Sequence, residues 1–445
     1  MRIRFWGTRG SLPKPGRTTL RYGGNTPCVE VRAPDGTLIV LDCGTGAHGL
    51  GQALLTGTPP VRGHLLLTHT HWDHIQGFPF FAPLFVPGNE WDIYAPQGLG
   101  QRLDQTLAGQ MQYAYFPITL AQLGAAVRYH NLAEEAFELG GVRVTTRYLN
   151  HPGLALGYRL EAAGVSVVYA TDHEPHSSHS LGARAGSEPV HLEDRRHVEF
   201  LAGADLVIHD AQYTLAEYPG KRTWGHTPAE LAVDLARAAG ARRLALFHHD
   251  PLRDDEALDK LVTTCRSRAA GSQLEVLAAA EGQSIELTAA AVAAPAASRS
   301  ERTIGDAGLS PPAPTILIVD DDPDVVRLLT LTLEHEGFHL LSAPDGKTAL
   351  EMARALRPDL VLLDWEMPGQ NGLEVCRALR AERDRHLSRM PIIMLTGKTK
   401  AEDTEDGFAA GATDYVIKPF KAAHVRSRVH AWLLRSRRTE PEGRT

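Results

Sequence analysis

Cysteine is scarce in this sequence, and its few residues do not form a recognisable pattern. The 445 residues contain four cysteines, and no two of them form a Cys-x-x-Cys pair. Scattered single cysteines are typical of reduced proteins rather than of secreted domains held together by disulfides. We therefore expect a cytoplasmic protein without disulfide bonds. The four residues are Cys28, Cys43, Cys265 and Cys376.

Long apolar runs and a strong charge of one sign are also missing. No stretch approaches the 18 consecutive apolar residues of a membrane span. Residues 1–6 alternate polar and apolar side chains like a strand, and they lack the apolar stretch of a signal peptide. The net charge of −7 gives no electrostatic basis for general binding to nucleic acid or anionic lipid. We expect no membrane contact and no DNA binding.

The chain does have the length and composition for more than one domain. A protein of 445 residues with 43% hydrophobic residues can bury at least two cores. Residues 289–313 are rich in alanine, proline and serine, which is typical of a semi-extended linker. We expect this linker to separate a first domain, residues 1–288, from a second, residues 314–436. Residues 437–445 then form a short tail.

The most informative stretch of the first domain places metal-ligand residue types directly after an apolar run. Residues 65–67 are typical of a buried strand, and the pattern His-x-His-x-Asp-His then begins at His69. Side chains two apart on a strand share a face, so His69 and His71 can point to one place. Asp73 and His74, on the following turn, can reach a second place nearby. Imidazole and carboxylate groups suit zinc or a similar divalent ion, so the pattern predicts a metal site.

Later apolar runs of the first domain end in residues of the same kinds. Each run has the length of a buried strand, and each is followed within a few residues by a histidine or an aspartate. Several such endings in one domain indicate a shared metal site. The last run ends in two adjacent histidines, and the pattern alone does not choose between them. The residues are His151, Asp172, His248 and His249.

Three further expectations concern the surroundings of this site. Asp42 ends another apolar run, and it is equally well explained as a turn cap or as support for a metal ligand. Thr227 is a suitable cap for a helix whose first residue is Pro228. The polar segment Glu174–Arg196 is interpreted as an irregular surface insertion that supplies no ligand.

The second domain alternates apolar runs with helical segments, which predicts a parallel sheet. Its apolar runs end in Asp320 and Asp321, in Asp364, in Thr396 and in Lys418. Parallel sheets bind ligands at the carboxyl ends of their strands. Clustered acids suit Mg²⁺ there, and a lysine suits a phosphoryl oxygen.

The first domain resembles the metallo-β-lactamase superfamily through its His-x-His-x-Asp-His motif. The resemblance implies an α/β fold, an αββα sandwich, with a dinuclear site at one edge. The two divalent ions would be zinc, with manganese as the second choice. His248 is preferred to His249 because the last ligand of the family comes first after its strand. One metal would take His69, His71 and His151, the other Asp73, His74 and His248, and Asp172 would bridge them.

Within the superfamily, the closest resemblance is to the phosphodiesterase branch that includes RNase Z. It rests on the run His209-Asp210-Ala211-Gln212 and the later His226, although aspartate stands at 210 where RNase Z has glutamate. The resemblance implies a metal-dependent phosphodiesterase acting on a small cyclic phosphodiester or nucleotide. Asp73 would bind metal and orient the attacking water. His226, held by Asp210, would protonate the leaving alkoxide or stabilise its charge.

Other reactions at the same site stay open at this stage. The sequence shows no basic arm rich in glycine and proline of the kind that RNase Z uses to bind tRNA, which favours a small substrate. The alternatives are hydrolysis of another bond, such as a lactone or thioester, and RNA processing by the same dinuclear site.

The second domain resembles response-regulator receivers, because the pattern Asp-x-x-Met-Pro-x-x-x-Gly of that family runs from Asp364 to Gly372. The resemblance implies a flavodoxin-like (βα)5 fold in a two-component phosphorelay. Asp364 would accept a phosphoryl group from a sensor histidine kinase or phosphotransfer protein, and the receiver would regulate the hydrolase. Pairing of two receivers in a homodimer stays open. The Mg²⁺ and phosphoryl contacts would come from Asp320, Asp321, the Glu366 carbonyl, Thr396 and Lys418, with Tyr415 as the switch aromatic.

Overall fold

A computed structural model describes most of the chain. The described residues are 1–57, 59–96, 102–176, 192–289, 313–397, 407, 410–420 and 422–436. The expected linker lies outside them except for its two end residues, and the expected tail lies wholly outside them. The chain divides into two units, Met1–Thr288 and Ala289–Thr445, and we describe each by itself. Among the described helices, none combines the length and apolar character that a membrane crossing requires.

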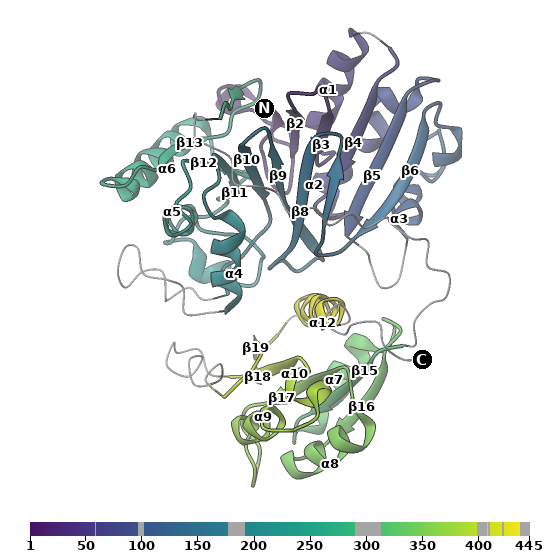
Figure 1. The fold of residues 1–445 in the computed structure, drawn as a ribbon, viewed down its shortest axis with the longest axis vertical. Helices are drawn as coiled ribbons and strands as arrows, with labels where there is room; N and C mark the ends of the chain where they lie inside the picture. The colour runs from purple at the N-terminus through teal and green to yellow at the C-terminus, as the bar shows by residue number, and fades with distance from the viewer. Residues whose placement is uncertain are drawn as a thin grey trace. The chain divides into compact units, whose positions relative to one another are not determined.

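Two seven-stranded sheets form the frame of the first unit (Figure 1). One sheet has the order β14-β1-β2-β3-β4-β5-β6, and the other has the order β13-β12-β11-β10-β9-β8-β7. The first comprises β1 Arg2–Gly7, β2 Cys28–Arg32, β3 Leu38–Leu41, β4 Arg62–Leu66, β5 Glu90–Pro96, β6 Ala126–Leu132 and β14 Ser284–Glu286. The second comprises β7 Ala136–Leu139, β8 Val142–Leu149, β9 Ala155–Ala162, β10 Val165–Ala170, β11 Leu206–Asp210, β12 Arg243–Phe247 and β13 Glu275–Ala278.

The two sheets contact each other through large buried side chains. The Phe5 ring of β1 lies 6.1 Å from the Phe247 ring of β12, measured between centroids. The Tyr158 hydroxyl of β9 donates a hydrogen bond of 2.5 Å to the Leu67 carbonyl, directly after β4. Contacts of this kind bury apolar surface between the two sheets, and each Å² removed from water contributes roughly 25 cal/mol to stability.

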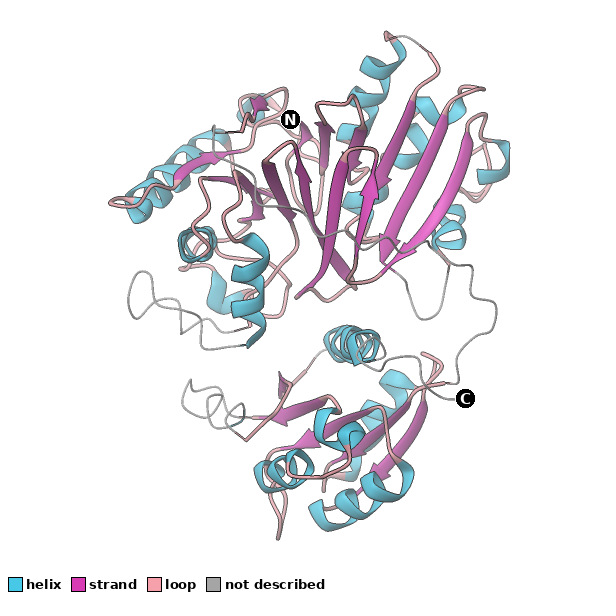
Figure 2. Cartoon of the chain, in the orientation of Figure 1, coloured by secondary structure: helices cyan, strands magenta, loops and turns pink. Residues whose placement is uncertain are grey.

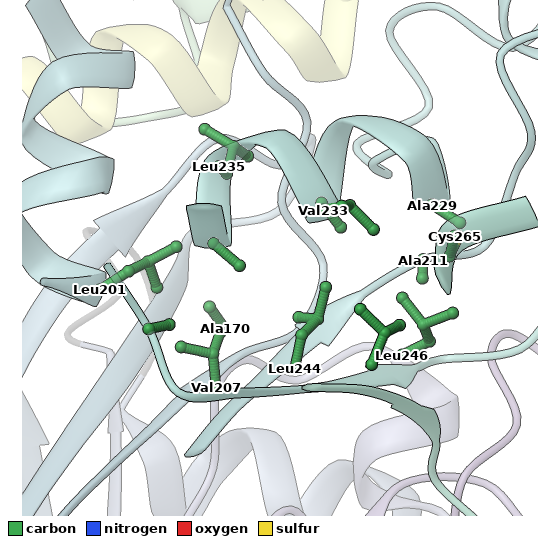
Figure 3. Packing of buried hydrophobic residues seen from close by; sticks show 14 of the residues in the cluster. Ala170, Leu201, Val207, Ala211, Ala229, Val233, Leu235, Leu244, Leu246 and Cys265 are labelled. Carbon is green, nitrogen blue, oxygen red and sulfur yellow. The ribbon is translucent and has the colours of Figure 1, made fainter. Parts of the chain in front are cut away.

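Helices cover the outer faces of the sandwich. Figure 3 shows the cluster on the second sheet, where Val207, Leu244 and Leu246 of the strands lie beneath Val233 of α5, and Leu235 of the same helix belongs to this cluster too. Residues of α1 and α3 join the corresponding cluster on the first sheet. The αββα sandwich expected from the sequence is confirmed. The helices of this unit are α1 Gly46–Leu55, α2 Trp72–Ile75, α3 Leu103–Gln110, α4 Leu192–Leu201, α5 Ala229–Ala238 and α6 Asp255–Ala269.

Parallel pairing brings several strand ends to one edge of the sandwich. Strands β10, β11 and β12 are parallel neighbours in the second sheet, and β3 and β4 are parallel neighbours in the first. The carboxyl ends of parallel neighbours meet at the same edge. The residues that follow these five strands can therefore meet, although they are far apart in the sequence.

The second unit is a five-stranded parallel sheet in the order β16-β15-β17-β18-β19. Two clusters of buried residues draw on its alternating side chains, and its helices lie on both faces (Figure 2). The expected flavodoxin-like receiver fold is confirmed. The elements are β15 Thr315–Val319, α7 Pro323–Leu333, β16 His339–Ala343, α8 Gly346–Leu356, β17 Leu360–Asp364, α9 Gly372–Arg380, α10 Arg385–Arg389, β18 Ile392–Thr396, β19 Asp414–Ile417 and α12 Ala422–Ser436.

Two local expectations are wrong. The segment expected to be an irregular surface insertion ends in the first half of α4, residues 192–196, and its first residue, Glu174, is buried; residues 177–191 lie outside the described part of the chain. Thr227 does not cap α5, because Pro228 takes the N-cap position and the helix begins at Ala229. The Thr227 hydroxyl instead donates a hydrogen bond to the His173 carbonyl. Tertiary contacts outweigh the local capping preference here.

Candidate metal centre

Unusual backbone conformations concentrate around the strand ends of the first unit. Seven non-glycine residues of the described chain have positive φ, and five of them lie at or beside the predicted metal site. Such conformations cost about 1–3 kcal/mol each and persist where the surrounding structure imposes them. This clustering marks the edge of the sandwich as a site held in place by its neighbours. The five are Ser11, Asp42, Asp172, Thr223 and His248.

The structure brings all seven predicted metal ligands together. The ligand atoms of one group lie within 4.8 Å of one another, and so do those of a second group. The first group comes from the end of β4 and the loop after β8, and the second comes from α2 and the end of β12. These are the two sets that the resemblance implies. The first set is His69, His71 and His151, and the second is Asp73, His74 and His248.

Asp172 lies between the two groups and faces both. Its Oδ1 is 3.8 Å from His151 Nε2 and 4.0 Å from His69 Nε2. Its Oδ2 is 3.1 Å from His74 Nε2 and 3.3 Å from His248 Nε2. Each oxygen of one carboxylate is thus directed at one group, which is the arrangement that a bridging ligand requires.

Asp73 belongs to the second group through one of its oxygens. Asp73 Oδ2 lies 3.1 Å from His248 Nε2 and 3.3 Å from His74 Nε2. The same oxygen accepts a hydrogen bond of 2.7 Å from the Ser11 backbone N–H. This contact ties the centre to the loop after β1, which the sequence did not indicate.

The unused nitrogens of the histidines show that the cluster fits a metal. His74 Nδ1 donates to Asp42 Oδ2 at 2.8 Å, and His151 Nδ1 donates to the Gly225 carbonyl at 3.0 Å. In each ring Nε2 then faces the cluster, and in the neutral ring this atom carries the lone pair that binds a metal. The Nε2 atoms of His69 and His74 are buried and make no hydrogen bond among the described residues. Buried acceptors directed at one another and at carboxylates suit divalent cations.

Asp42 supports a ligand and is more than a turn cap. Besides His74, its carboxylate accepts hydrogen bonds from the Thr68 backbone N–H at 2.7 Å and from the Tyr169 hydroxyl at 2.8 Å. It is fully buried between the two sheets. Such a network fixes the ring orientation of His74, and it resolves the two explanations that the sequence left open.

His249 points away from the cluster. Its Nε2 donates to the Ala279 carbonyl at 2.9 Å, next to β13. Burial lowers its pKa to about 3, so the ring is neutral. Of the two adjacent histidines, the structure places His248 at the metal centre.

Charge in the cluster is balanced between imidazoles and carboxylates. Burial lowers the pKa of His69 well below its ordinary value and that of His151 to about 3, so both rings are in the neutral form that binds metal. Burial opposes ionisation of Asp73, but His74 and His248 outweigh it and hold its pKa well below the ordinary value. Asp172 is likewise held ionised by His248 and His74 against the effect of burial.

His226 and Asp210 meet at the same place without belonging to either group. His226 Nδ1 lies 2.8 Å from Asp210 Oδ2 and 3.8 Å from Asp172 Oδ1. Burial opposes protonation of His226, but Asp210 and then Asp172 outweigh it and raise its pKa to about 9. The ring also stacks on His248, with centroids 4.9 Å apart. Asp210 thus favours the protonated form of His226 next to the predicted metal site, so this ring is suited to act as an acid.

The centre is open on one side. His71 is the exposed member of its group, whereas His69 and His151 are buried. The neighbouring Trp72 is 74% exposed. Water and substrate can therefore approach the cluster past His71.

Sequence reasoning missed two residues that shape this site. Glu174 accepts hydrogen bonds from the backbone N–H groups of Thr223 and Gly225 and so holds the loop before His226. At Gly225, whose φ is +86°, an added Cβ would lie 2.2 Å from His151 Nδ1, so only glycine fits. Gly225 stands next to His226 in the sequence, but the sequence does not show that it packs against His151.

The predicted phosphorylation site of the second unit also assembles. Lys418 Nζ donates to Asp320 Oδ2 at 2.8 Å and to Asp364 Oδ1 at 2.6 Å. The second Asp364 oxygen accepts from the Glu366 backbone N–H at 3.0 Å. Burial raises the pKa of Asp364, with Lys418 opposing it. Thr396 is buried at the end of the neighbouring strand β18.

Two further predicted residues lie around this site. Asp321 is exposed beside the buried Asp320, so its carboxylate is open to solvent. Tyr415 is half-buried on β19 and packs against the cluster that contains Trp365 and Met394. An aromatic ring that is neither fully buried nor fully exposed can change its burial, as the switch prediction requires.

Comparisons with known proteins divide the chain in the same way. Residues 37–249 match the family model of a beta-lactamase superfamily domain, and residues 316–430 match that of a response regulator receiver domain. The DNA-binding response regulator MtrA of Mycolicibacterium smegmatis is 50% identical over 127 residues, which are 28% of this chain and 52% of that protein. The chain thus spans about half the length of the curated relatives it matches.

Two solved structures are similar to the first unit. The metallo-beta-lactamase fold protein YhfI of Bacillus subtilis has a TM-score of 0.44 and 17% identity, over 64% of this chain and 98% of that one. A diphosphatase from the PhnP family has a TM-score of 0.44 and 19% identity, over 65% of this chain and 98% of that one.

Proposed function

Because this chain joins a beta-lactamase superfamily domain to a response regulator receiver domain, we propose that it is a metal-dependent phosphodiesterase regulated by phosphorylation. Its substrate is a small phosphodiester, cyclic or nucleotide. The observation that carries this proposal is the His226–Asp210 pair beside the two ligand groups. A protonated imidazole at that position suits the departure of an alkoxide, which needs a proton.

The chain's own residues have separable tasks in this reaction. Divalent ions, zinc or manganese, supply Lewis acidity and lower the pKa of water when they are bound. The two histidine groups and Asp172 hold those ions. The Asp73 oxygen that faces His248 accepts a hydrogen bond from the Ser11 N–H. This hydrogen bond fixes the carboxylate beside the attacking water. His226 holds a proton on Nε2 for the leaving oxygen, and Asp210 keeps the ring in that orientation.

The receiver completes the proposal. Asp364 accepts a phosphoryl group from a histidine kinase or phosphotransfer protein, and Asp320, Asp321 and the Glu366 carbonyl would hold the Mg²⁺ that this transfer needs. All four cysteines are free and buried, which fits the reducing cytoplasm where such kinases act.

The test measures metal content and turnover together. Protein freed of metal by chelation should lose hydrolysis of bis-p-nitrophenyl phosphate, and zinc or manganese should restore it at about two ions per chain. His226→Ala should lower turnover about 10²–10⁴-fold because it removes acid catalysis. Its metal content should stay at the wild-type level, because His226 is not a proposed ligand.

Matched variants and substrates keep these results interpretable. Asp210→Asn tests the orientation of His226 with little change of shape, and His249→Ala serves as a histidine control that lies outside the cluster. Loss of metal from the His226→Ala protein would contradict the assigned roles. Faster hydrolysis of a lactone or thioester than of phosphodiesters would contradict the reaction class.

A further inference from the structure

The loop between β11 and α5 is held rigidly beside the metal centre. Glu174 accepts three hydrogen bonds from it: 2.8 Å from the Tyr218 hydroxyl, 2.9 Å from Thr223 N–H and 2.8 Å from Gly225 N–H. The loop leads directly to His226. A buried carboxylate with three donors fixes the backbone of this loop, so the side chains on it have defined positions.

One of these positions places an indole and an ammonium group together at the surface. Lys221 Nζ lies 4.3 Å from the centroid of the Trp224 ring, and Trp224 is 47% exposed. Between them in sequence, Thr223 has a φ of +66°, which a β-branched residue rarely adopts. The arrangement is therefore imposed by the surrounding structure, and it costs free energy to maintain.

Tyr213 connects this Lys221–Trp224 pair to the catalytic residues. Lys221 Nζ lies 5.5 Å from the Tyr213 ring centroid. The other side of the contact is His226, whose ring meets Tyr213 edge-on with centroids 5.7 Å apart. One aromatic ring thus touches both the ammonium and the proposed acid. The pair is one side chain away from the place where a phosphodiester would be cleaved.

The charge of Lys221 is available to a ligand. Within the described part of the chain, Lys221 forms no ion pair and no hydrogen bond through its side chain; its two contacts are with the aromatic rings. Arg253, by contrast, is engaged with Glu217 at 2.8 Å. An ammonium stacked on aromatic rings keeps its charge and its three donors.

We propose that the Lys221–Trp224 pair binds the nucleoside part of a nucleotide substrate, with the base stacked on Trp224 and a second phosphate paired with Lys221. The inference rests on the proposed phosphodiesterase function and names its substrate class. A bare sugar phosphate would use the ammonium but not the indole. A nucleotide with a second phosphate would use both groups. Its phosphate would pair with the ammonium, and its base would stack on the indole, which contributes about 1–3 kcal/mol per base.

The test compares three diesters that release the same p-nitrophenol. Methyl p-nitrophenyl phosphate carries neither a base nor a second phosphate. Thymidine 5′-(p-nitrophenyl phosphate) adds the base, and its 3′-phosphorylated form adds the second phosphate. Wild type, Trp224→Ala and Lys221→Gln are assayed as full chains loaded with metal. Tyr113→Ala, at an aromatic residue 84% exposed, and Lys260→Gln, at an exposed lysine, are the matched controls.

Ratios of kcat/KM between substrates separate a loss of substrate recognition from a general loss of activity. Trp224→Ala should reduce the preference for the thymidine diester over the methyl diester by about fivefold or more. Lys221→Gln should reduce the preference for the 3′-phosphorylated form by about threefold or more. Both controls should keep wild-type ratios. Unchanged ratios in both variants would overturn the inference, and a change in Lys221→Gln alone would leave an anion site and overturn base stacking.

Calorimetric titration with thymidine 3′,5′-bisphosphate gives a readout that needs no hydrolysis. Wild type should bind it, and both variants should bind it less tightly. Binding by a wild type that cleaves none of the three diesters would support this site and contradict the proposed phosphodiesterase. Turnover of the methyl diester by a wild type that does not bind the bisphosphate would support the proposed phosphodiesterase and contradict this site.

Discussion

At the scale of single residues, two histidines of the predicted metal centre take their direction from the hydrogen bond of the other ring nitrogen. His74 is oriented by Asp42, and His151 by the Gly225 carbonyl. These partners lie on strands and loops distant in sequence from the ligands that they orient. Metal affinity should therefore depend on residues that never touch a metal.

Asp42 provides the sharpest test of this dependence. Asp42→Asn keeps the shape of the side chain, and asparagine tolerates the φ of +58° found there. Its amide group would face the N–H of His74, so the ring would lose its acceptor. We expect metal affinity to fall about 10–100-fold, measured by competition with a chromophoric chelator.

The control for this variant is Asp35→Asn. Asp35 accepts hydrogen bonds from Thr37 and Gly141 in an exposed turn and lies away from the ligands. Metal affinity should be the same as in wild type. Equal affinities in the two variants would show that Asp42 is only structural.

At the scale of elements, the site depends on how α5 packs on the second sheet. Leu244 and Leu246 of β12 face this helix (Figure 3), and His248 directly follows β12. The loop that carries His226 leads into α5 itself. The same cluster thus positions one ligand and the proposed acid, so its packing and the chemistry are linked.

Leu244→Ala should destabilise the first unit by about 2–5 kcal/mol, because it leaves a cavity under α5. Leu244 is fully buried. The free energy of unfolding is measured by urea denaturation of the metal-free chain, so that metal binding does not mask the loss. Leu20→Ala, at a leucine 78% exposed, should change it by less than about 0.5 kcal/mol. Similar losses in the two variants would contradict the packing described here.

At the scale of the whole molecule, the chain joins a beta-lactamase superfamily domain to a response regulator receiver domain. In the receiver, Lys418 bridges two carboxylates that would otherwise repel each other, Asp320 and Asp364. A phosphoryl group on Asp364 adds charge at that point and competes for Lys418. When the contacts of Lys418 with the two carboxylates change, the burial of the half-buried Tyr415 can change with them.

We expect phosphorylation of Asp364 to change the turnover of the hydrolase. A tenfold change requires only about 1.4 kcal/mol of differential stabilisation between two states. Turnover of bis-p-nitrophenyl phosphate is compared with and without beryllofluoride and Mg²⁺, in wild type and in Asp364→Ala. The mimic should alter the rate of the wild type alone. Identical rates throughout, with binding of the mimic to the wild type established, would mean that the receiver does not control the enzyme directly.

Much of the architecture was predictable from local pattern. Strands β10, β12, β15, β17 and β18 are largely apolar runs that lead to ligand-type residues, because strands buried on both faces are apolar along most of their length. Strand β16, His339–Ala343, was missed because it is half-exposed and carries no ligand-type residue at its end. The cap at Thr227 was predicted wrongly because His173, 54 residues away, takes its hydroxyl.

The sequence by itself determined which residue types stand at the strand ends, and therefore the proposed ligand set and the proposed phosphoryl acceptor, because residue type and spacing along a strand are local properties. The tertiary structure decided the rest. It turned His248 into the cluster and His249 toward Ala279, made Asp42 a support for His74, and brought Glu174 under the loop that leads to His226. It also placed Lys221 against Trp224 and Tyr213. These choices depend on contacts between segments far apart in the chain, and a one-dimensional pattern does not contain them.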